Sequence, residues 1–102
     1  MSFVPKGIIP AMITPLTQEG KINEKSLKKL VDFLIDGGSH GIFVVGTTGE
    51  FYGLTEEEKE RLFALTIEYA EGRVPVYAGT GAITTKECIQ LTQLAEKHKV
   101  DA

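Results

Sequence analysis

The chain has 102 residues, of which 25% are charged and 42% hydrophobic, and its formal net charge is −3. This composition is typical of a soluble globular protein, and its acidic balance excludes a basic surface that follows a nucleic-acid backbone. The single cysteine, Cys88, excludes an internal disulfide or a thiolate metal cluster, and we expect it to be a small core residue. Residues 1–10 lack the features of a secretory signal, and no apolar run approaches the roughly 20 residues that span a bilayer. We therefore expect a cytoplasmic protein without nucleic-acid or membrane partners.

The first predicted unit is a strand followed by a helix. The segment Gly7–Thr14 (GIIPAMIT) has the apolar character of a strand. Asn23 is placed as the helix N-cap, and Ile22 and Leu27 have the spacing of a hydrophobic staple. The helix is expected to end at Gly37–Gly38. Its apolar stripe consists of Leu27, Leu30, Val31, Leu34 and Ile35.

The second unit repeats this order. Ile42–Val45 is a run of four apolar, partly β-branched residues, which is typical of a strand that is covered on both faces in a parallel sheet. Thr55 and Glu58 form a capping box that predicts the start of the next helix. Gly72 lies beyond the end of that helix. The apolar face of the helix consists of Leu62, Leu65 and Tyr69.

The third unit has the same form. Val74–Ala78 is predicted as its strand and Thr84–Lys97 as its helix, again opened by a capping box of Thr84 and Glu87. Val100–Ala102 has the character of a fourth strand at its beginning. A chain that stops inside a strand is expected to be the front part of a longer protein.

The repeated strand and helix predict an α/β fold with a parallel sheet and right-handed connections. Strands recur about every thirty residues, so eight such repeats would supply the roughly 250 residues of a closed (β/α)8 TIM barrel. The three strands end in Thr14–Pro15, Thr47–Thr48 and Thr80–Gly81, which in a barrel would meet on one face. We therefore favour a barrel over a doubly wound sheet. Residues 1–102 would be the N-terminal part of one barrel domain, without an internal boundary, covering three units and the start of the fourth strand.

The turn after the second strand, Gly46-Thr47-Thr48-Gly49-Glu50, carries the candidate site. Gly46 and Gly49 allow the backbone to bend and approach a ligand, and the hydroxyls of Thr47 and Thr48 can each donate and accept a hydrogen bond. A carboxylate or carbonyl oxygen would find partners here without a full positive charge. The sequence therefore predicts a small-anion site.

Two other interpretations of this turn stay open. It could be a plain connection between the strand and the following helix. Gly46, Gly49 and Gly53 could also be a loosened dinucleotide-binding fingerprint, but that motif follows a first strand and opens directly into a helix. Here the glycines follow the second strand.

The sequence resembles the N-terminal third of the dihydrodipicolinate synthase and N-acetylneuraminate lyase superfamily, which are pyruvate-dependent Schiff-base lyases on a (β/α)8 barrel. The resemblance covers essentially the whole chain. It is carried by AMITP at 11–15, SLKKL at 26–30, GTTGE at 46–50, RVPV at 73–76 and AGTG at 78–81.

The resemblance implies a role for each residue of the turn. Thr48, with the backbone of Gly46 and Gly49, would bind the carboxylate of pyruvate, and Thr47 would relay protons between two tyrosines. The Schiff-base lysine and its tyrosine partners would lie beyond Ala102, so the segment alone is expected to be inactive. The complete enzyme would condense pyruvate with aspartate semialdehyde, would need no metal or organic cofactor, and would be a homotetramer.

Two alternatives concern the function of the whole protein. Phe51–Gly53 departs from the polar sequence that is common after the motif in synthases, so an N-acetylneuraminate lyase or a 2-keto-3-deoxy sugar-acid aldolase or dehydratase is a second interpretation. A third is a non-catalytic assembly module. If the chain ended at Ala102, it would be a partial barrel whose two open edges invite pairing with another copy.

Overall fold

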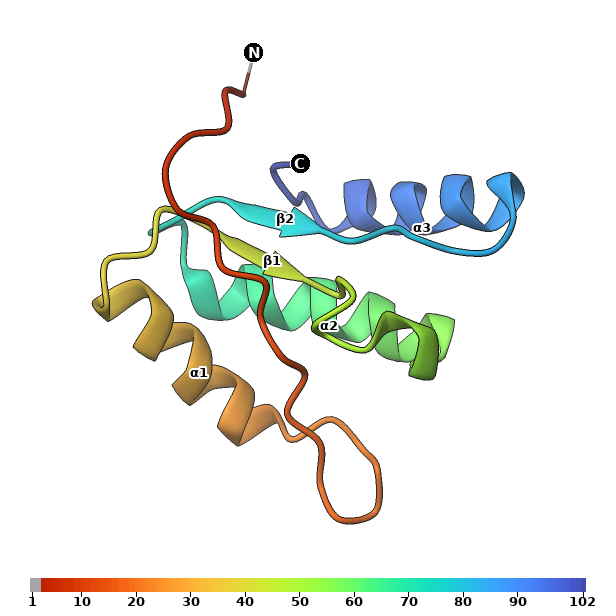
Figure 1. Cartoon of the computed structure of the whole chain (residues 1–102), viewed down its shortest axis with the longest axis horizontal. Coiled ribbons are helices and arrows are strands. Elements are labelled where there is room, and N and C mark those ends of the chain that lie inside the picture. Colours follow the sequence, from red (N-terminus) through yellow and green to blue (C-terminus); the bar gives the residue numbers. More distant parts are fainter. Residues whose placement is uncertain (1–2) are drawn as a thin grey trace.

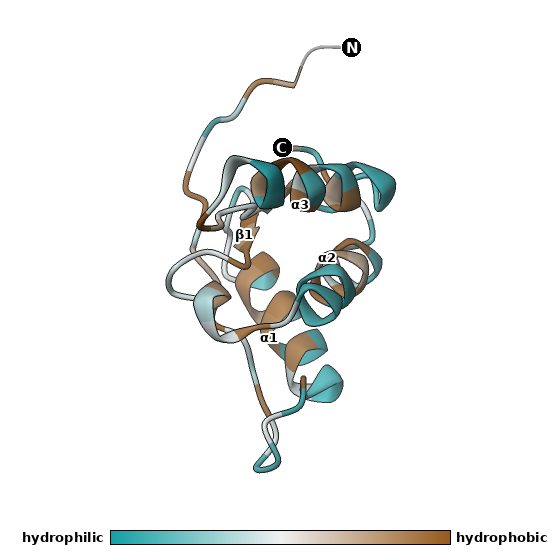
Figure 2. Ribbon diagram, turned by 90° about the vertical axis from the view of Figure 1, so that its right-hand side faces the viewer, coloured by the Kyte–Doolittle hydropathy of each residue, from teal (hydrophilic) through white to brown (hydrophobic). Residues whose placement is uncertain are grey.

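The computed structural model describes residues 3–102. Two short parallel strands lie side by side near the middle, with the first segment of the chain crossing beside β1 (Figure 1). The three α-helices lie on one side of the strands, with their apolar residues concentrated toward the interior (Figure 2). The elements in chain order are α1 (Glu24–Asp36), β1 (Ile42–Val44), the 3-10 helix η1 (Phe51–Gly53), α2 (Glu56–Ala70), β2 (Val76–Ala78) and α3 (Thr85–Lys97).

The extended segments lie in space in the order in which they occur along the chain. The first segment bonds to β1, where the N–H of Met12 donates to the carbonyl of Phe43 at 2.8 Å. β1 then pairs with β2 in parallel register, Phe43 opposite Tyr77. Residues 100–102 lie on the far side of β2, where the N–H of Ala78 donates to the carbonyl of Ala102 at 2.8 Å. A doubly wound sheet reverses its strand order at a switch point, and residues 3–102 contain no such reversal.

Two of the predicted strands are confirmed as β1 and β2, both shorter than expected, whereas the first and fourth predicted strands are extended segments that bond to a neighbour without forming regular strands. The predicted strand Gly7–Thr14 forms a single bridge to β1, because Pro10 has no N–H to donate. β1 ends one residue early because Val45 has a left-handed φ of 63°. β2 begins at Val76 instead of Val74 because Pro75 interrupts the ladder. Residues 100–102 bond to β2 without being a regular strand.

The helix starts follow the predicted caps. The side chain of Asn23 accepts from the N–H of Ser26 at 3.0 Å, and Thr55 and Glu58 form the complete reciprocal capping box. The box predicted for the third helix is only half present. Thr84 accepts from the N–H of Glu87, but within residues 3–102 the Glu87 side chain makes no return bond. The 3-10 helix η1 was not predicted.

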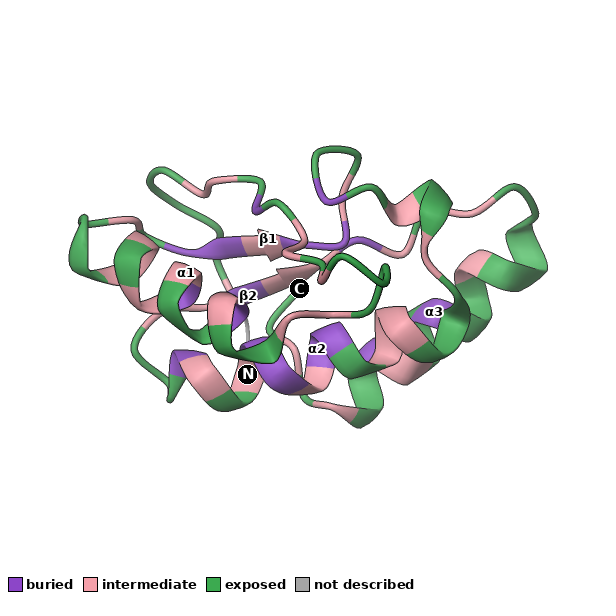
Figure 3. Ribbon diagram, turned by 90° about the horizontal axis from the view of Figure 1, so that it is seen from below, coloured by how far each residue is buried: buried purple, intermediate pink, exposed green. Residues whose placement is uncertain are grey.

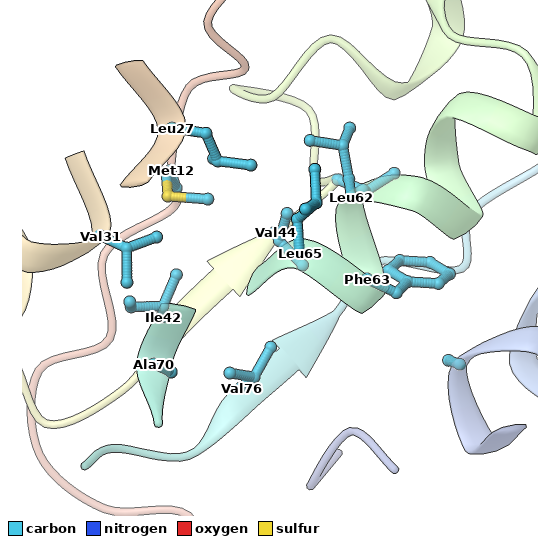
Figure 4. Close-up of a cluster of buried hydrophobic side chains, with 12 residues drawn as sticks. Met12, Leu27, Val31, Ile42, Val44, Leu62, Phe63, Leu65, Ala70 and Val76 are labelled. Carbon is cyan, nitrogen blue, oxygen red and sulfur yellow. The ribbon is translucent and has the colours of Figure 1, made fainter. Parts of the chain in front are cut away.

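The core lies between the strands and the helices, and the buried residues concentrate on the strands and on α2 (Figures 3 and 4). Ile42, Val44 and Val76 face the helices from alternate strand positions. Cys88, expected in the core, is only partly buried. The largest completely buried side chains are Phe63, Leu27, Ile42, Leu62 and Val31.

Polar side-chain contacts link the elements at the surface. Arg73, which precedes β2, contacts Asp32 of α1 at 2.7 Å, and this hydrogen bond lowers the pKa of the Asp32 carboxyl below its ordinary value. His98, at the end of α3, contacts Glu60 of α2 at 2.8 Å and likewise lowers the pKa of that carboxyl.

Within the described residues, no helix is both long enough and apolar enough to cross a membrane.

One buried polar group in α2 has no partner. Thr66 is 0% exposed, and within residues 3–102 its hydroxyl makes no hydrogen bond. We expect Thr66→Val in the natively expressed protein to raise the free energy of unfolding by about 1 kcal/mol, because the shape is kept and a desolvated hydroxyl is removed. Urea denaturation measures the change.

The matched control is Thr92→Val in α3. That hydroxyl is exposed and donates to the carbonyl of Cys88 at 2.8 Å, so its removal should not raise the free energy of unfolding. A Thr66→Val protein no more stable than Thr92→Val would contradict the prediction.

Candidate functional site

The turn at residues 46–50 lies at the carboxyl end of β1. Two backbone hydrogen bonds stabilise it. The N–H of Glu50 donates to the carbonyl of Thr47 at 3.0 Å, and the N–H of Phe51 donates to the carbonyl of Gly46 at 3.3 Å. The turn is bracketed by two residues with left-handed backbone, Val45 at φ 63° and Glu50 at φ 61°. The backbone therefore leaves the strand direction abruptly on both sides of the two threonines.

Thr47 and Thr48 lie at the exposed tip of this turn. Within residues 3–102, the backbone N–H groups of Thr47, Thr48 and Gly49 donate to no protein acceptor, and neither threonine hydroxyl is hydrogen-bonded. Successive unpaired N–H groups in a turn are suited to an anion, and the hydroxyls add donors that can also accept. The chemistry that this arrangement offers is the binding of a carboxylate or carbonyl oxygen.

The two predicted glycines have different surroundings. Gly46 is partly exposed and packs beside the ring of Phe43. Gly49 is buried against the first segment, where an added Cβ would lie 3.1 Å from the carbonyl oxygen of Met12 and 3.3 Å from Thr14 Oγ1. Gly46 therefore keeps partial exposure beside the two exposed threonines, whereas Gly49 anchors the turn against the neighbouring segment.

The ends of the neighbouring strands meet this turn. Thr14 Oγ1 donates to the carbonyl of Gly49 at 2.6 Å. The N–H of Gly79, just after β2, donates to the carbonyl of Val44 at 2.8 Å. An added Cβ at Gly81 would lie 3.7 Å from the ring of Phe51. The three strand ends thus gather on one side of the structure, as the sequence predicted.

Sequence reasoning missed the backbone conformation of Val45. Left-handed φ is rare for a β-branched residue, and the opposing steric clash costs about 1–2 kcal/mol. Strain of this kind persists where the surrounding structure imposes it, often beside a binding site. Nothing in the string Val-Val-Gly distinguishes this residue from an ordinary strand end.

No lysine of residues 3–102 is suited to form a Schiff base. All of them are at least partly exposed, whereas a Schiff-base lysine needs desolvation or a cationic neighbour. Lys59 Nζ lies 5.7 Å from the centre of the Phe51 ring, on the side of the turn facing α2. Tyr77 packs edge-to-face on Phe3 of the first segment, with ring centres 5.5 Å apart. Residues 3–102 contain no group of three or more His, Cys, Asp or Glu side chains placed to hold a metal.

Comparison with known proteins gives consistent matches. The model of the dihydrodipicolinate synthetase family matches residues 4–102. The 4-hydroxy-tetrahydrodipicolinate synthase of Persephonella marina is 49% identical over 96 residues, which are 94% of this chain and 32% of that protein. The chain thus spans about a third of the length of this curated relative.

Solved structures agree with the sequence matches. The chloride-inhibited dihydrodipicolinate synthase of Acinetobacter baumannii, complexed with pyruvate, is 42% identical with a TM-score of 0.91, covering 93% of this chain and 33% of that one. The N-acetylneuraminate lyase of Mycoplasma synoviae is 39% identical with a TM-score of 0.87, and the match covers 95% of this chain and 34% of that one. With a family match over nearly its whole length, this chain belongs to the dihydrodipicolinate synthetase family.

Proposed function

We propose that the protein containing this chain is a pyruvate-dependent Schiff-base lyase that condenses pyruvate with aspartate semialdehyde. The observation that carries the proposal is the turn at 46–50, with its unpaired backbone donors and two free hydroxyls at the carboxyl end of a parallel strand. The sequential strand order supports a (β/α)8 barrel, in which this end of the strands forms the active site.

Thr48, the neighbouring N–H groups and Gly46 would hold the carboxylate of pyruvate. A lysine outside residues 1–102 would attack the keto carbon and expel water to give an imine, and loss of a methyl proton would give the enamine that attacks the aldehyde. Thr47 would pass protons along the site, accepting one as it donates another, so its hydroxyl needs no shifted pKa. The family resemblance also supports a cytoplasmic homotetramer.

A second candidate has a specific observation in its favour. η1 places Tyr52, an exposed aromatic side chain, directly after the turn, and the chain matches the N-acetylneuraminate lyase of Mycoplasma synoviae closely. An N-acetylneuraminate lyase or a sugar-acid aldolase would use the same pyruvate site with a different aldehyde. The two candidates therefore differ in the second substrate and agree on the first.

The test is to trap the imine. The natively expressed protein is incubated with pyruvate, reduced with borohydride and weighed intact, and we expect one reduced pyruvate adduct per chain. Addition of aspartate semialdehyde, an N-acetylated amino sugar or a sugar aldehyde before reduction shows which of them discharges the adduct. A protein that stays unmodified would overturn the proposal and favour the assembly-module interpretation.

A further inference from the structure

Thr14 makes a contact that the proposed pyruvate site does not account for. Its Oγ1 donates to the carbonyl of Gly49 at 2.6 Å, across 35 residues of sequence. Within residues 3–102, this is the only hydrogen bond that joins residues 46–50 to another strand, because their other bonds are local to the turn. Beyond the backbone bonds between the first segment and β1, this hydroxyl and the close packing of Gly49 therefore hold the turn against the first segment.

Two peptide planes connect the hydrogen bond of Thr14 to the backbone N–H of Thr48. The peptide that joins Gly49 to Glu50 is planar and trans, so its C=O and N–H point in opposite directions. The C=O accepts from Thr14, and the N–H donates to the carbonyl of Thr47 at 3.0 Å. That carbonyl shares a peptide plane with the N–H of Thr48. Hydrogen bonds in such a chain also polarise one another.

We propose that Thr14 is a positioning residue for the carboxylate-binding turn, fixing the direction of the Thr48 N–H through the two peptide planes. This inference rests on the proposed function, because it assumes that the Thr48 N–H binds the carboxylate of pyruvate. Thr14 acts through Gly49 and does not itself contact the substrate. Its hydroxyl is partly buried beneath the turn.

The test is Thr14→Val in the natively expressed protein, which removes the donor and keeps the β-branched shape. We expect the KM for pyruvate to rise about tenfold, the effect of losing one hydrogen bond of about 1.4 kcal/mol. The kcat should change by less than about threefold, because the reacting groups are untouched. Thr14→Ser keeps the hydroxyl and should restore KM to within about twofold of the wild type.

Two controls separate positioning from general destabilisation. Thr17→Val removes a hydroxyl that bonds to the N–H of Lys21 in the next loop, and it should leave KM unchanged. Borohydride trapping at saturating pyruvate counts the active sites, so partly unfolded protein lowers the count without raising KM. If Thr14→Val does not fold, Thr14→Cys supplies a weak donor of similar size and should give an intermediate KM.

The outcomes are distinct. A wild-type protein that forms no pyruvate adduct overturns the proposed function. A wild-type protein that forms the adduct, with a Thr14→Val variant whose KM is within about twofold of it, overturns only the positioning role. A raised KM in Thr14→Val that Thr14→Ser does not restore also overturns it, because the hydroxyl would then not be the cause.

Discussion

Thr47→Val is expected to lower kcat by about 100-fold or more in the natively expressed protein, because a positioned acid-base group contributes about 10²–10⁴-fold. The Thr47 hydroxyl lies at the exposed tip of the turn and, within the described residues, has no hydrogen-bond partner that would hold it in a structural role. Valine keeps the β-branched shape, so the backbone donors of the turn should stay in place. Steady-state measurement of kcat and KM for pyruvate checks the prediction.

The two matched controls are at the same turn. Thr47→Ser retains the hydroxyl and should keep most of kcat. Thr48→Val should have the opposite signature, a raised KM for pyruvate with a smaller fall in kcat, because binding in the ground and transition states is lost together. A Thr47→Val enzyme with wild-type kcat would contradict the relay role and leave the turn with a binding function alone.

The local elements could be predicted because their signals are short-range. Asn23 and the pair Thr55 and Glu58 fix helix starts through hydrogen bonds within one turn, and these bonds are present. The second and third strands were placed correctly by their apolar runs, but their lengths were overestimated, and the first is only an extended segment with a single bridge. Pro10 and Pro75 were visible in the sequence, and their missing N–H groups explain where regular pairing fails.

The tertiary features of the site could not be predicted in the same way. The hydrogen bond from Thr14 to Gly49 depends on how two segments meet, which no local pattern encodes. The left-handed backbone of Val45 runs against the preference of its own residue type, so propensity predicts the opposite. Sequence reasoning thus singled out Thr47 and Thr48, whose roles stay a prediction, but not the contacts that hold their turn.

Gly79→Ala is expected to destabilise the natively expressed protein by at least about 3 kcal/mol, the upper part of the range for overpacking. A Cβ at Gly79 would overlap the carbonyl oxygen of Val45 and lie 2.7 Å from its carbonyl carbon. These are backbone atoms and cannot rotate away as a flexible side chain does. The same Cβ would also lie 3.0 Å from Cε1 of the Phe43 ring, which adds to the crowding.

The same clash should weaken pyruvate binding, because relief requires the Val45 carbonyl to move and Val45 leads directly into the turn. Separation of the two strand ends would also break the 2.8 Å bond from the Gly79 N–H to the carbonyl of Val44. Gly53→Ala is the matched control, since nothing lies within 4 Å of its added Cβ and its φ is not positive. The free energy of unfolding, measured by urea denaturation, should therefore fall and the KM for pyruvate should rise in Gly79→Ala. Both should stay near their wild-type values in Gly53→Ala. A Gly79→Ala protein within about 1 kcal/mol of wild type would show that the strand ends can part without cost, and that the strained conformation of Val45 is not imposed by its neighbour.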